Sequence, residues 1–332
     1  MNPINISSEV FSILRLLTDG VFHTESALTK QLTYSDVNIT NALKDIDHLG
    51  IEIINLSGCG YCWRNPILWL NLNSILENPA DNSKHYHLKI FDSIDSTNNY
   101  LINGIDGYYC NNSYIPVVAA EFQTNGRGRQ GHTWHTGLGD SLTFSLRWYF
   151  EQNASSLSGL SLVIGIAIVR VLKYFSISDV NLKWPNDIYY NFQKLAGVLI
   201  ETRRETLTSI FAIIGIGINF NLSEIVKSSI GRKVTDLLEI TGKCLNRNLV
   251  FGILLSELHD VLINFEKYGF TYFKKEWISY HAYEGRSITL NLPNNSVIEG
   301  TVDGINDDGS LCLITSMGRA SFSVGDISMR MK

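Results

Sequence analysis

Gly126-Arg127-Gly128-Arg129-Gln130-Gly131-His132-Thr133-Trp134 places three glycines and two arginines within six positions, with a tryptophan close behind. Glycine lets a backbone approach a ligand closely and adopt φ > 0. Arginine binds phosphate or carboxylate through forked N–H donors. The stretch therefore predicts a loop that holds an anion, and the rest of the chain has to indicate which one.

A strand predicted at Phe211 to Phe220 has one bare face. Gly215, Gly217 and Asn219 lie on that face, and isoleucines alternate with them on the other. Interior glycines weaken a strand because they pack poorly and cost entropy. Two explanations stay open at this point: a flat ligand lies across the glycines, or another element packs closely over them.

Two more segments carry charge near predicted turns. Lys183-Trp184-Pro185-Asn186-Asp187 brings a cation, an amide and a carboxylate together at the end of a strand. Lys194 follows across a short hairpin, with the small residues Ala196 and Gly197 behind it, which leave room for a ligand. Two lysines and two arginines would then converge on one anion; the alternative is an Asn-Asp turn with solvated charges.

The polar run from Asp92 to Asn99 precedes the apolar residues 100–102. Such a run caps a helix, and a helix N-terminus with hydroxyl and amide side chains also binds polar ligands. The chain contains neither a G-x-S-x-G elbow nor a phosphate-loop motif. The chemistry predicted is therefore electrostatic stabilisation of an anionic transition state, without a covalent enzyme intermediate.

Composition narrows the class of protein. A net charge of -5 gives no basic footprint for nucleic acid. Five cysteines are an odd count that suits a reducing cytosol, and the Cys59–Cys62 pair lacks the second ligand pair of a zinc site. The start of the chain has no signal-peptide pattern, and Arg170 interrupts the longest apolar run. We expect a cytoplasmic protein with no membrane partner.

Residues 1–65 predict a winged helix-turn-helix domain. Apolar residues at helical spacing begin near Val10, and Thr24 can cap a short helix from Glu25 to about Leu32. A second helix starts at Ser35 or Asp36 and runs to Leu49. Gly50 ends that helix. A hairpin over residues 51–63 forms the wing.

The rest of the chain predicts a linker at 66–84, an α+β domain at 85–280 and a small β domain at 281–332, rich in Gly and Asn turns. Expected elements of the α+β domain are strands at Val117–Gln123, Ser141–Trp148, Leu182–Tyr190, Lys194–Glu201 and Ile210–Phe220, and helices at Leu157–Phe175 and Leu249–Tyr268.

These motifs together resemble the biotin protein ligase family. The resemblance lies in the order and spacing of five segments: Asp95–Asn98, Gly126–Trp134, Lys183–Asp187, Lys194–Glu201 and Gly215–Asn219. Over nearly its whole length the chain is similar to the bifunctional ligase/repressor of the BirA type. The resemblance implies an N-terminal winged helix-turn-helix, a central mixed-sheet catalytic domain of the biotin/lipoate ligase type, and a C-terminal SH3-like small β-barrel.

The resemblance also implies a reaction. Biotin and ATP form biotinyl-5′-AMP with Mg²⁺ on the phosphates, and a lysine of the biotin carboxyl carrier protein of acetyl-CoA carboxylase then takes the biotin. Further implied partners are operator DNA and a second copy, in a homodimer formed once biotinyl-5′-AMP is made. Two rival functions are a DNA-binding repressor without ligase activity and a lipoate–protein ligase.

Site residues follow from the same resemblance, residue by residue. Its biotin-binding set is Ser96, Thr97, Asn98, Gln123, Arg127 (through its backbone), Gly128, Arg129 and Lys194. Its adenylate and ATP set is Gly126, Trp134, Asn186, Gly215, Gly217 and Asn219. Its catalytic set is Arg129, Lys194, Lys183 and Asp187, and no residue is a dedicated metal ligand.

The chain departs from the family pattern in two places. Gln130 and His132 stand where several relatives carry basic residues, so the loop is less charged. The DNA-binding segment Glu25 to Lys44, with Ser35, Asn38, Asn41 and Lys44 as its candidate contacts, lies in a domain with four Lys or Arg against seven Asp or Glu, a net of -3. Since affinity for DNA rests largely on phosphate neutralisation, we expect weak DNA binding.

Overall fold

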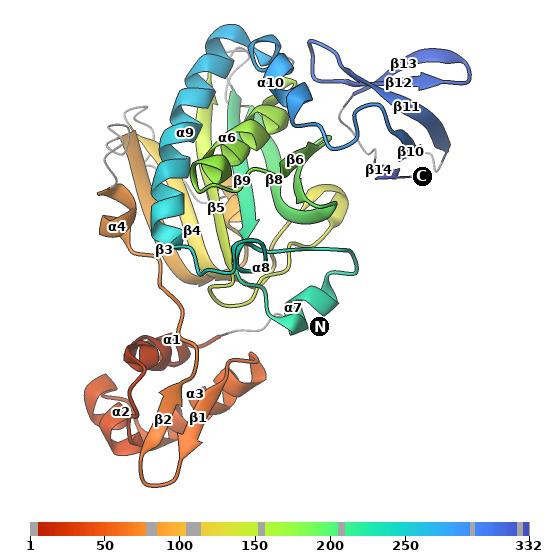
Figure 1. Ribbon diagram of the computed structural model, residues 1–332. Helices are drawn as coiled ribbons and strands as arrows, with labels where there is room; N and C mark the ends of the chain where they lie inside the picture. Colours follow the sequence, from red (N-terminus) through yellow and green to blue (C-terminus); the bar gives the residue numbers. More distant parts are fainter. Residues whose placement is uncertain are drawn as a thin grey trace.

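The computed structural model describes residues 6–77, 85–103, 114–151, 157–204, 210–292, 296–323 and 328–331. Three units follow one another along the chain: a helical unit with a hairpin, a large sheet flanked by helices, and a small antiparallel sheet (Figure 1). The mixed α+β class and the order of the units agree with the sequence prediction.

The N-terminal unit has the predicted helix, turn, helix and hairpin. Its elements are α1 (Ser8–Leu16), η1 (Leu17–Asp19), α2 (Glu25–Leu32), α3 (Asp36–His48), β1 (Ile53–Leu56) and β2 (Gly60–Trp63). Thr24 caps α2 by accepting from the N–H of Ala27 at 3.2 Å, and Ser35 caps α3 by accepting from the N–H of Asn38 at 3.2 Å. Gly50 follows α3 with φ +72, so the predicted stop is confirmed.

The predicted linker is partly packed against its neighbours. Trp69 donates from its indole N–H to the hydroxyl of Thr18 at 2.7 Å, and the Arg15 guanidinium lies 4.2 Å from its ring centroid. Leu70 and Ile75 are buried in the core of the large unit, and Ile75 belongs to the short helix α4 (Leu72–Leu76). The first part of 66–84 therefore joins the two units, while 78–84 lie outside the described residues.

The large unit is built on a seven-stranded mixed sheet in the order β3-β4-β5-β9-β8-β7-β6. Only β3 and β4 pair in parallel; the other neighbours are antiparallel. The strands are β3 (Tyr86–Ile94), β4 (Ile115–Gln123), β5 (Ser141–Phe150), β6 (Val180–Lys183), β7 (Asp187–Tyr190), β8 (Gln193–Arg204) and β9 (Ile210–Asn219).

One strand prediction is wrong in detail. The stretch Leu182–Tyr190 is two antiparallel strands, β6 and β7, with a turn at residues 184–186. Pro185 lies in that turn, and a proline cannot donate to a ladder. The break brings Lys183 and Asp187 opposite each other in the register.

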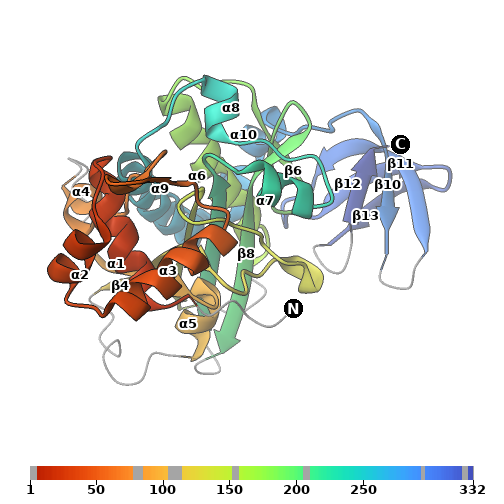
Figure 2. The same cartoon turned by 90° about the horizontal axis from the view of Figure 1, so that it is seen from below.

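Helices α6 (Leu160–Tyr174) and α9 (Arg247–Tyr268) cover one face of this sheet (Figures 1 and 2). The core lies between them and the even-numbered residues of β9, such as Ile214 and Ile216. Among the described helices, only α9 is long and apolar enough to cross a membrane, but 56% of its most apolar stretch is buried inside the fold. Helix α5 (Thr97–Asn103) packs on the opposite face.

The remaining elements follow the sheet. They are α7 (Glu224–Ser229), α8 (Leu237–Thr241), η5 (Phe270–Tyr272) and α10 (Lys274–Ser279), and then β10 (Ser287–Asn291), β11 (Val297–Ile305), β12 (Leu311–Thr315), β13 (Gly318–Phe322) and β14 (Ser328–Met331). The last five strands form one antiparallel sheet in the order β13-β12-β11-β10-β14. Residues 293–295, between β10 and β11, lie outside the described residues.

Asp140 makes folding stability depend on pH. Burial raises its pKa to about 6, although its carboxylate accepts hydrogen bonds from the Gly137 N–H and the Ser141 hydroxyl. The native state therefore binds a proton more tightly than the unfolded chain, whose Asp pKa is near 3.8. The cost of ionising Asp140 in the fold grows as the pH rises from about 4 to about 6, to about 3 kcal/mol.

We expect Asp140→Asn to remove this cost. The free energy of unfolding of the variant, relative to the unchanged chain, should rise by about 3 kcal/mol between pH 4 and pH 7. Urea denaturation at both pH values measures it. Parallel stability profiles for the two proteins would contradict the prediction.

Candidate functional site

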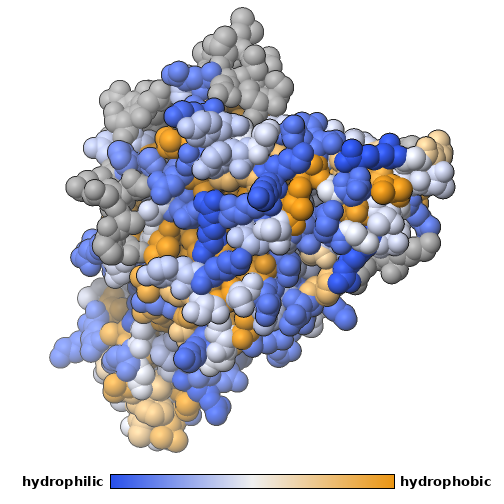
Figure 3. Space-filling view, turned by 45° about the horizontal axis from the view of Figure 1, so that its top comes forward, coloured by the Kyte–Doolittle hydropathy of each residue, from blue (hydrophilic) through white to orange (hydrophobic). Residues whose placement is uncertain are grey.

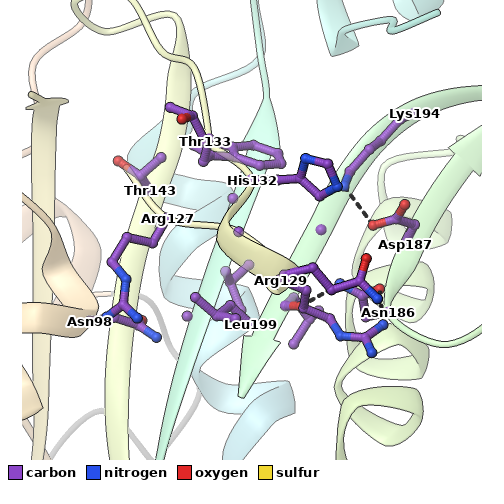
Figure 4. A pocket seen from close by; sticks show the side chains of 18 of the residues that line it. Asn98, Arg127, Arg129, His132, Thr133, Thr143, Asn186, Asp187, Lys194 and Leu199 are labelled. Carbon is purple, nitrogen blue, oxygen red and sulfur yellow. Dashed lines mark hydrogen bonds and ion pairs between the residues drawn. The ribbon is translucent and has the colours of Figure 1, made fainter. Parts of the chain in front are cut away.

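A pocket opens on the sheet face opposite α6 and α9, beneath the glycine–arginine loop (Figure 4). The odd-numbered residues of β8 and β9, Gly197, Leu199, Gly215 and Gly217, contribute to its floor. It encloses about 990 Å³ of empty space counted out to its open mouth.

The loop is a closed hairpin of backbone hydrogen bonds. The backbone N–H of Trp134 donates to the carbonyl of Gly126 at 2.9 Å, and the backbone N–H of Gly128 donates to the carbonyl of His132 at 2.7 Å. A Cβ at Gly126 would lie 2.4 Å from the Trp134 carbonyl oxygen, so this crossing requires glycine. At the tip, η3 (Arg129–Gly131) contains Gln130 with φ 56.

The two arginines of the loop point in different directions, although residues two apart in an extended strand would lie on the same face. Figure 4 shows Arg127 turned toward Asn98 and Arg129 toward Asn186. Arg129 donates to the side-chain oxygen of Asn186 at 3.3 Å, whereas Arg127 pairs with Glu201 outside the lining of the pocket. Of the two guanidinium groups, only that of Arg129 is directed at the far wall of the pocket.

Side chains of the protein itself cover the bare face of β9. A Cβ at Gly217 would lie 2.4 Å from the Trp134 ring, and one at Gly215 would lie 2.3 Å from the Asn98 oxygen. A Cβ at Gly197 on β8 would lie 3.3 Å from the same indole. Close packing thus accounts for the glycines: the loop residue Trp134 covers Gly217 and Gly197, and Asn98 of α5 covers Gly215. Trp134 and Asn98 also line the pocket.

Buried polar side chains at the start of α5 form the inner end of the pocket. Gln123 accepts from the backbone N–H of Thr97 at 2.8 Å. The hydroxyl of Ser145 lies 2.7 Å from that of Thr97 and 2.5 Å from the side-chain oxygen of Asn98. Ser96, Thr97, Asn98 and Ser145 are all buried. Both explanations of the 92–99 run therefore apply, since it starts a helix and lines a cavity.

The opposite wall carries the charges predicted from the β6–β8 segments. The ammonium group of Lys194 lies 2.6 Å from a carboxylate oxygen of Asp187, and both side chains are nearly buried, at 12% and 13% exposed. It also lies 5.5 Å from the centroid of the Trp134 ring. Lys183 contacts the hydroxyl of Tyr189 at 3.2 Å. The pocket thus has a polar inner end and a cationic outer wall.

The structure brings most of the predicted site residues to this one pocket. Ser96, Thr97, Asn98, Gln123, Arg127, Gly128, Arg129, Trp134, Lys183, Asn186, Asp187, Lys194, Gly215 and Gly217 line it. Gly126 and Asn219 are outside the lining: Gly126 closes the loop, and Asn219 donates to the backbone carbonyl of Thr235 at 3.0 Å.

Sequence reasoning missed several contributors to the site, among them Ser145, Glu201 and Arg232. Ser145 lies on the polar face of β5, where alternation with apolar residues was the available signal. Glu201 ends a recognised motif but was given no role. Arg232 lines the pocket from the segment after α7, and no pattern in the sequence points to it.

No group of three or more His, Cys, Asp or Glu that could hold a metal occurs in the described part of the chain. Cys59 and Cys62 are free thiols in the hairpin wing.

Gly217→Ala should displace Trp134, because the added methyl group would overlap the indole. We expect ligand affinity at the pocket to fall at least about tenfold, since small displacements at a binding site are costly. Isothermal titration measures this loss. Trp134→Ala is the control: adding Gly217→Ala to it should cause little further loss, and a full additional tenfold loss would contradict the proposed cause.

The candidate DNA-contacting residues lie at the start of α3 and along its exposed side. Ser35 is the cap of α3, and Asn38, Asn41 and Lys44 are exposed on that helix. Apolar surface gathers on this unit, at the lower left in Figure 3. Exposed large apolar residues of the unit include Val21, Phe22, Val37, Ile54 and Leu56.

Comparison with known proteins gives consistent matches. Residues 90–219 match the biotin/lipoate A/B protein ligase family, and residues 284–330 match the biotin protein ligase C terminal domain. The chain is 31% identical over 318 residues to the bifunctional ligase/repressor BirA of Escherichia coli, covering 96% of each chain.

A solved structure agrees with these matches. A biotin protein ligase from Aquifex aeolicus, in complex with biotin and ATP, is similar with a TM-score of 0.62 and 29% identity, covering 74% of this chain and 99% of that one. A biotin–[acetyl-CoA-carboxylase] ligase of Mycobacterium tuberculosis is 27% identical over 64% of this chain and 77% of its own. With its pocket, its motifs and a full-length relative in agreement, this chain belongs to the biotin protein ligase family.

Proposed function

We propose that this chain joins biotin to a lysine of the biotin carboxyl carrier protein of acetyl-CoA carboxylase, in two steps that consume ATP. The observation that carries the proposal is the pocket itself: an end lined by buried polar side chains faces a wall with Arg129, Lys194 and Lys183. Membership of the family supplies the substrate class.

In the first step an oxygen of the biotin carboxylate attacks the α-phosphorus of ATP, the bond to the bridging β-phosphate oxygen breaks, and pyrophosphate leaves. Negative charge accumulates where two anions meet. Arg129 and Lys194 stand on that side of the pocket and would stabilise the transition state electrostatically. Phosphoryl transfer of this kind needs positioning and neutralisation more than covalent help.

In the second step the neutral amine of the carrier lysine attacks the acyl carbon of biotinyl-5′-AMP, AMP leaves, and the amine loses a proton. Asp187 and Asn186 border the pocket where that lysine would enter. Asp187, whose carboxylate is paired with Lys194, would help to orient the incoming amine. Lys183 contributes a further positive charge at this wall.

The inner end of the pocket would hold the biotin ring. Ser96, Thr97, Asn98 and Gln123 present fixed donors and acceptors there, and the backbone of Arg127 and Gly128 borders the same space. Gly126, Trp134, Gly215, Gly217 and Asn219 would shape the adenylate side. Mg²⁺ would arrive on the ATP phosphates, in keeping with its preference for phosphate oxygens and retained waters. Free cysteines among the described residues fit a cytoplasmic enzyme.

Pyrophosphate release separates this proposal from lipoate ligation. We expect release with ATP and biotin, little release with ATP and lipoate, and transfer of biotin to a purified carrier domain. Stronger release with lipoate would assign the chain to lipoate ligation, and no release with either acid would reject both enzymes.

A second role, as a biotin-dependent repressor, rests on one observation: α3 exposes Asn38, Asn41 and Lys44 on a helix-turn-helix. Asparagines of this kind read adenine in the major groove. The acidic balance of residues 1–65 predicts weak binding with a small salt slope. A mobility-shift assay on the chain's own upstream DNA, with and without biotinyl-5′-AMP, tests it, and a homodimer formed with the adenylate would be expected. Absence of any shift at low ionic strength would reject this role.

A further inference from the structure

Glu201 connects the glycine–arginine loop to the inner end of the pocket without lining the pocket. Its carboxylate lies near the end of β8 and is about one quarter exposed, at 23%. One oxygen accepts from Arg127 at 2.7 Å. The other accepts from Arg127 at 3.2 Å and from the amide of Asn98 at 2.8 Å. A single carboxylate thus holds one residue of the loop and one of α5.

The loop side of this connection is a two-point anchor. Arg127 and Glu201 form a forked pair, the geometry in which guanidinium and carboxylate bind most specifically. The same guanidinium donates to the side-chain oxygen of Asn99 at 2.6 Å. Because its side chain is held in this way, Arg127 fixes this part of the loop to β8 and α5.

On the pocket side, the Glu201 carboxylate fixes which groups donate hydrogen bonds and which accept them. A carboxylate accepts hydrogen bonds and cannot donate them, so Glu201 turns the NH₂ of Asn98 toward itself. The oxygen of Asn98 must then face the hydroxyl of Ser145, which lies 2.5 Å away. The hydroxyl of Ser145 donates to that oxygen. The Glu201 carboxylate therefore sets the direction of two hydrogen bonds at the inner end of the pocket.

We infer that Glu201 is a positioning residue that couples closure of the loop to the orientation of the biotin-binding amide of Asn98. The inference rests on the proposed function for its substrate. Loss of this carboxylate should therefore speed the release of ligand in two ways. The loop loses its anchor, and the Asn98 side chain becomes free to rotate. The chemical step depends on Arg129 and Lys194 instead.

The variants are Glu201→Gln, Arg127→Met and the double variant, each in the full chain. Glu201→Gln should raise KM for biotin about tenfold and speed the release of bound biotinyl-5′-AMP about tenfold, as expected for loss of charge-assisted hydrogen bonds. The value of kcat at saturating biotin should stay within about threefold. Arg127→Met should speed release but change KM for biotin less, because Glu201 still holds Asn98. The double variant should release the adenylate no faster than Glu201→Gln.

The matched control is Glu257→Gln. Glu257 pairs with Arg170 at 2.8 Å and is 26% exposed, close to the values for Glu201, but it lies on α9 across the sheet from the pocket. It should leave KM and the release rate unchanged. The inference would be overturned if Glu201→Gln kept the KM and the release rate of the unchanged chain. It would also be overturned if the effects of the two single variants on release multiplied in the double variant.

A readout without substrate keeps this inference separate from the proposed function. Trypsin cleavage after Arg129 should be about tenfold faster in Glu201→Gln and in Arg127→Met than in the unchanged chain, because the loop loses its anchor. Equal cleavage rates would overturn the coupling even if biotin ligation is confirmed. Faster cleavage in a chain that does not activate biotin would reject the proposed function and leave the anchor in place.

Discussion

Lys194→Met is expected to slow pyrophosphate release from ATP and biotin by at least about 100-fold, as removal of one preorganised electrostatic group commonly does. The ammonium group of Lys194 is nearly buried, at 12% exposed, and stands at the cationic wall of the pocket. Charges act strongly there because little water screens them. The main effect should be on kcat, since the negative charge to be stabilised develops in the transition state.

The substitution also leaves the Asp187 carboxylate without its partner. An unpaired buried carboxylate destabilises the fold or takes up a proton. Lys194→Met combined with Asp187→Asn removes that side effect and should remain equally inactive. Lys274→Met is the control, because Lys274 forms an ion pair with Asp307 at 2.7 Å outside the pocket lining. Near-normal pyrophosphate release by the double variant would remove Lys194 from the mechanism.

Glu121→Ala is expected to lower the free energy of unfolding by about 3 to 5 kcal/mol, the cost of leaving a buried charge unpaired. Glu121 and Arg247 lie 2.7 Å apart, with side chains 0% and 5% exposed. Arg247 also donates to the carbonyls of Ser141 at 3.1 Å and Leu68 at 2.7 Å. The pair thus ties β4 and α9 to the segment that leads from the winged unit.

Equilibrium urea denaturation measures this loss. Glu52→Ala is the matched control, because its partner Arg64 lies 3.8 Å away and both side chains are well exposed, at 69% and 64%. An exposed pair of this kind contributes at most about 1 kcal/mol. If Glu121→Ala costs no more than Glu52→Ala, the buried pair does not hold the segments together.

Local pattern was sufficient for most of the elements. Helical spacing and capping residues predicted α2 and α3, and their caps Thr24 and Ser35 were correctly expected. Strict alternation predicted β5 and β9 because a side-chain period of two separates the two faces of a strand. The division of Leu182–Tyr190 into two strands was missed, although Pro185, Asn186 and Asp187 are residues typical of a turn.

The site was only partly predictable. Five segments carry motifs with fixed residue types, so their residues could be named in advance. The partners of those residues could not, since Glu201 is 74 positions from Arg127 and 103 from Asn98. Contacts at such separation depend on the order of strands in the sheet, which no local pattern encodes.

The sequence by itself determined the glycine–arginine loop, the bare face of β9, the winged helix-turn-helix and membership of the family. These depend on local rules: where φ > 0 is needed, which face of a strand lacks side chains, and which residue starts or ends a helix. Only the tertiary structure decided that Trp134 covers Gly217, that Arg127 is an anchor and Arg129 faces the pocket, and that Lys194 pairs with Asp187. The physical reason is that these choices follow from which side chains the sheet brings within bonding distance, and that is a property of the assembled fold.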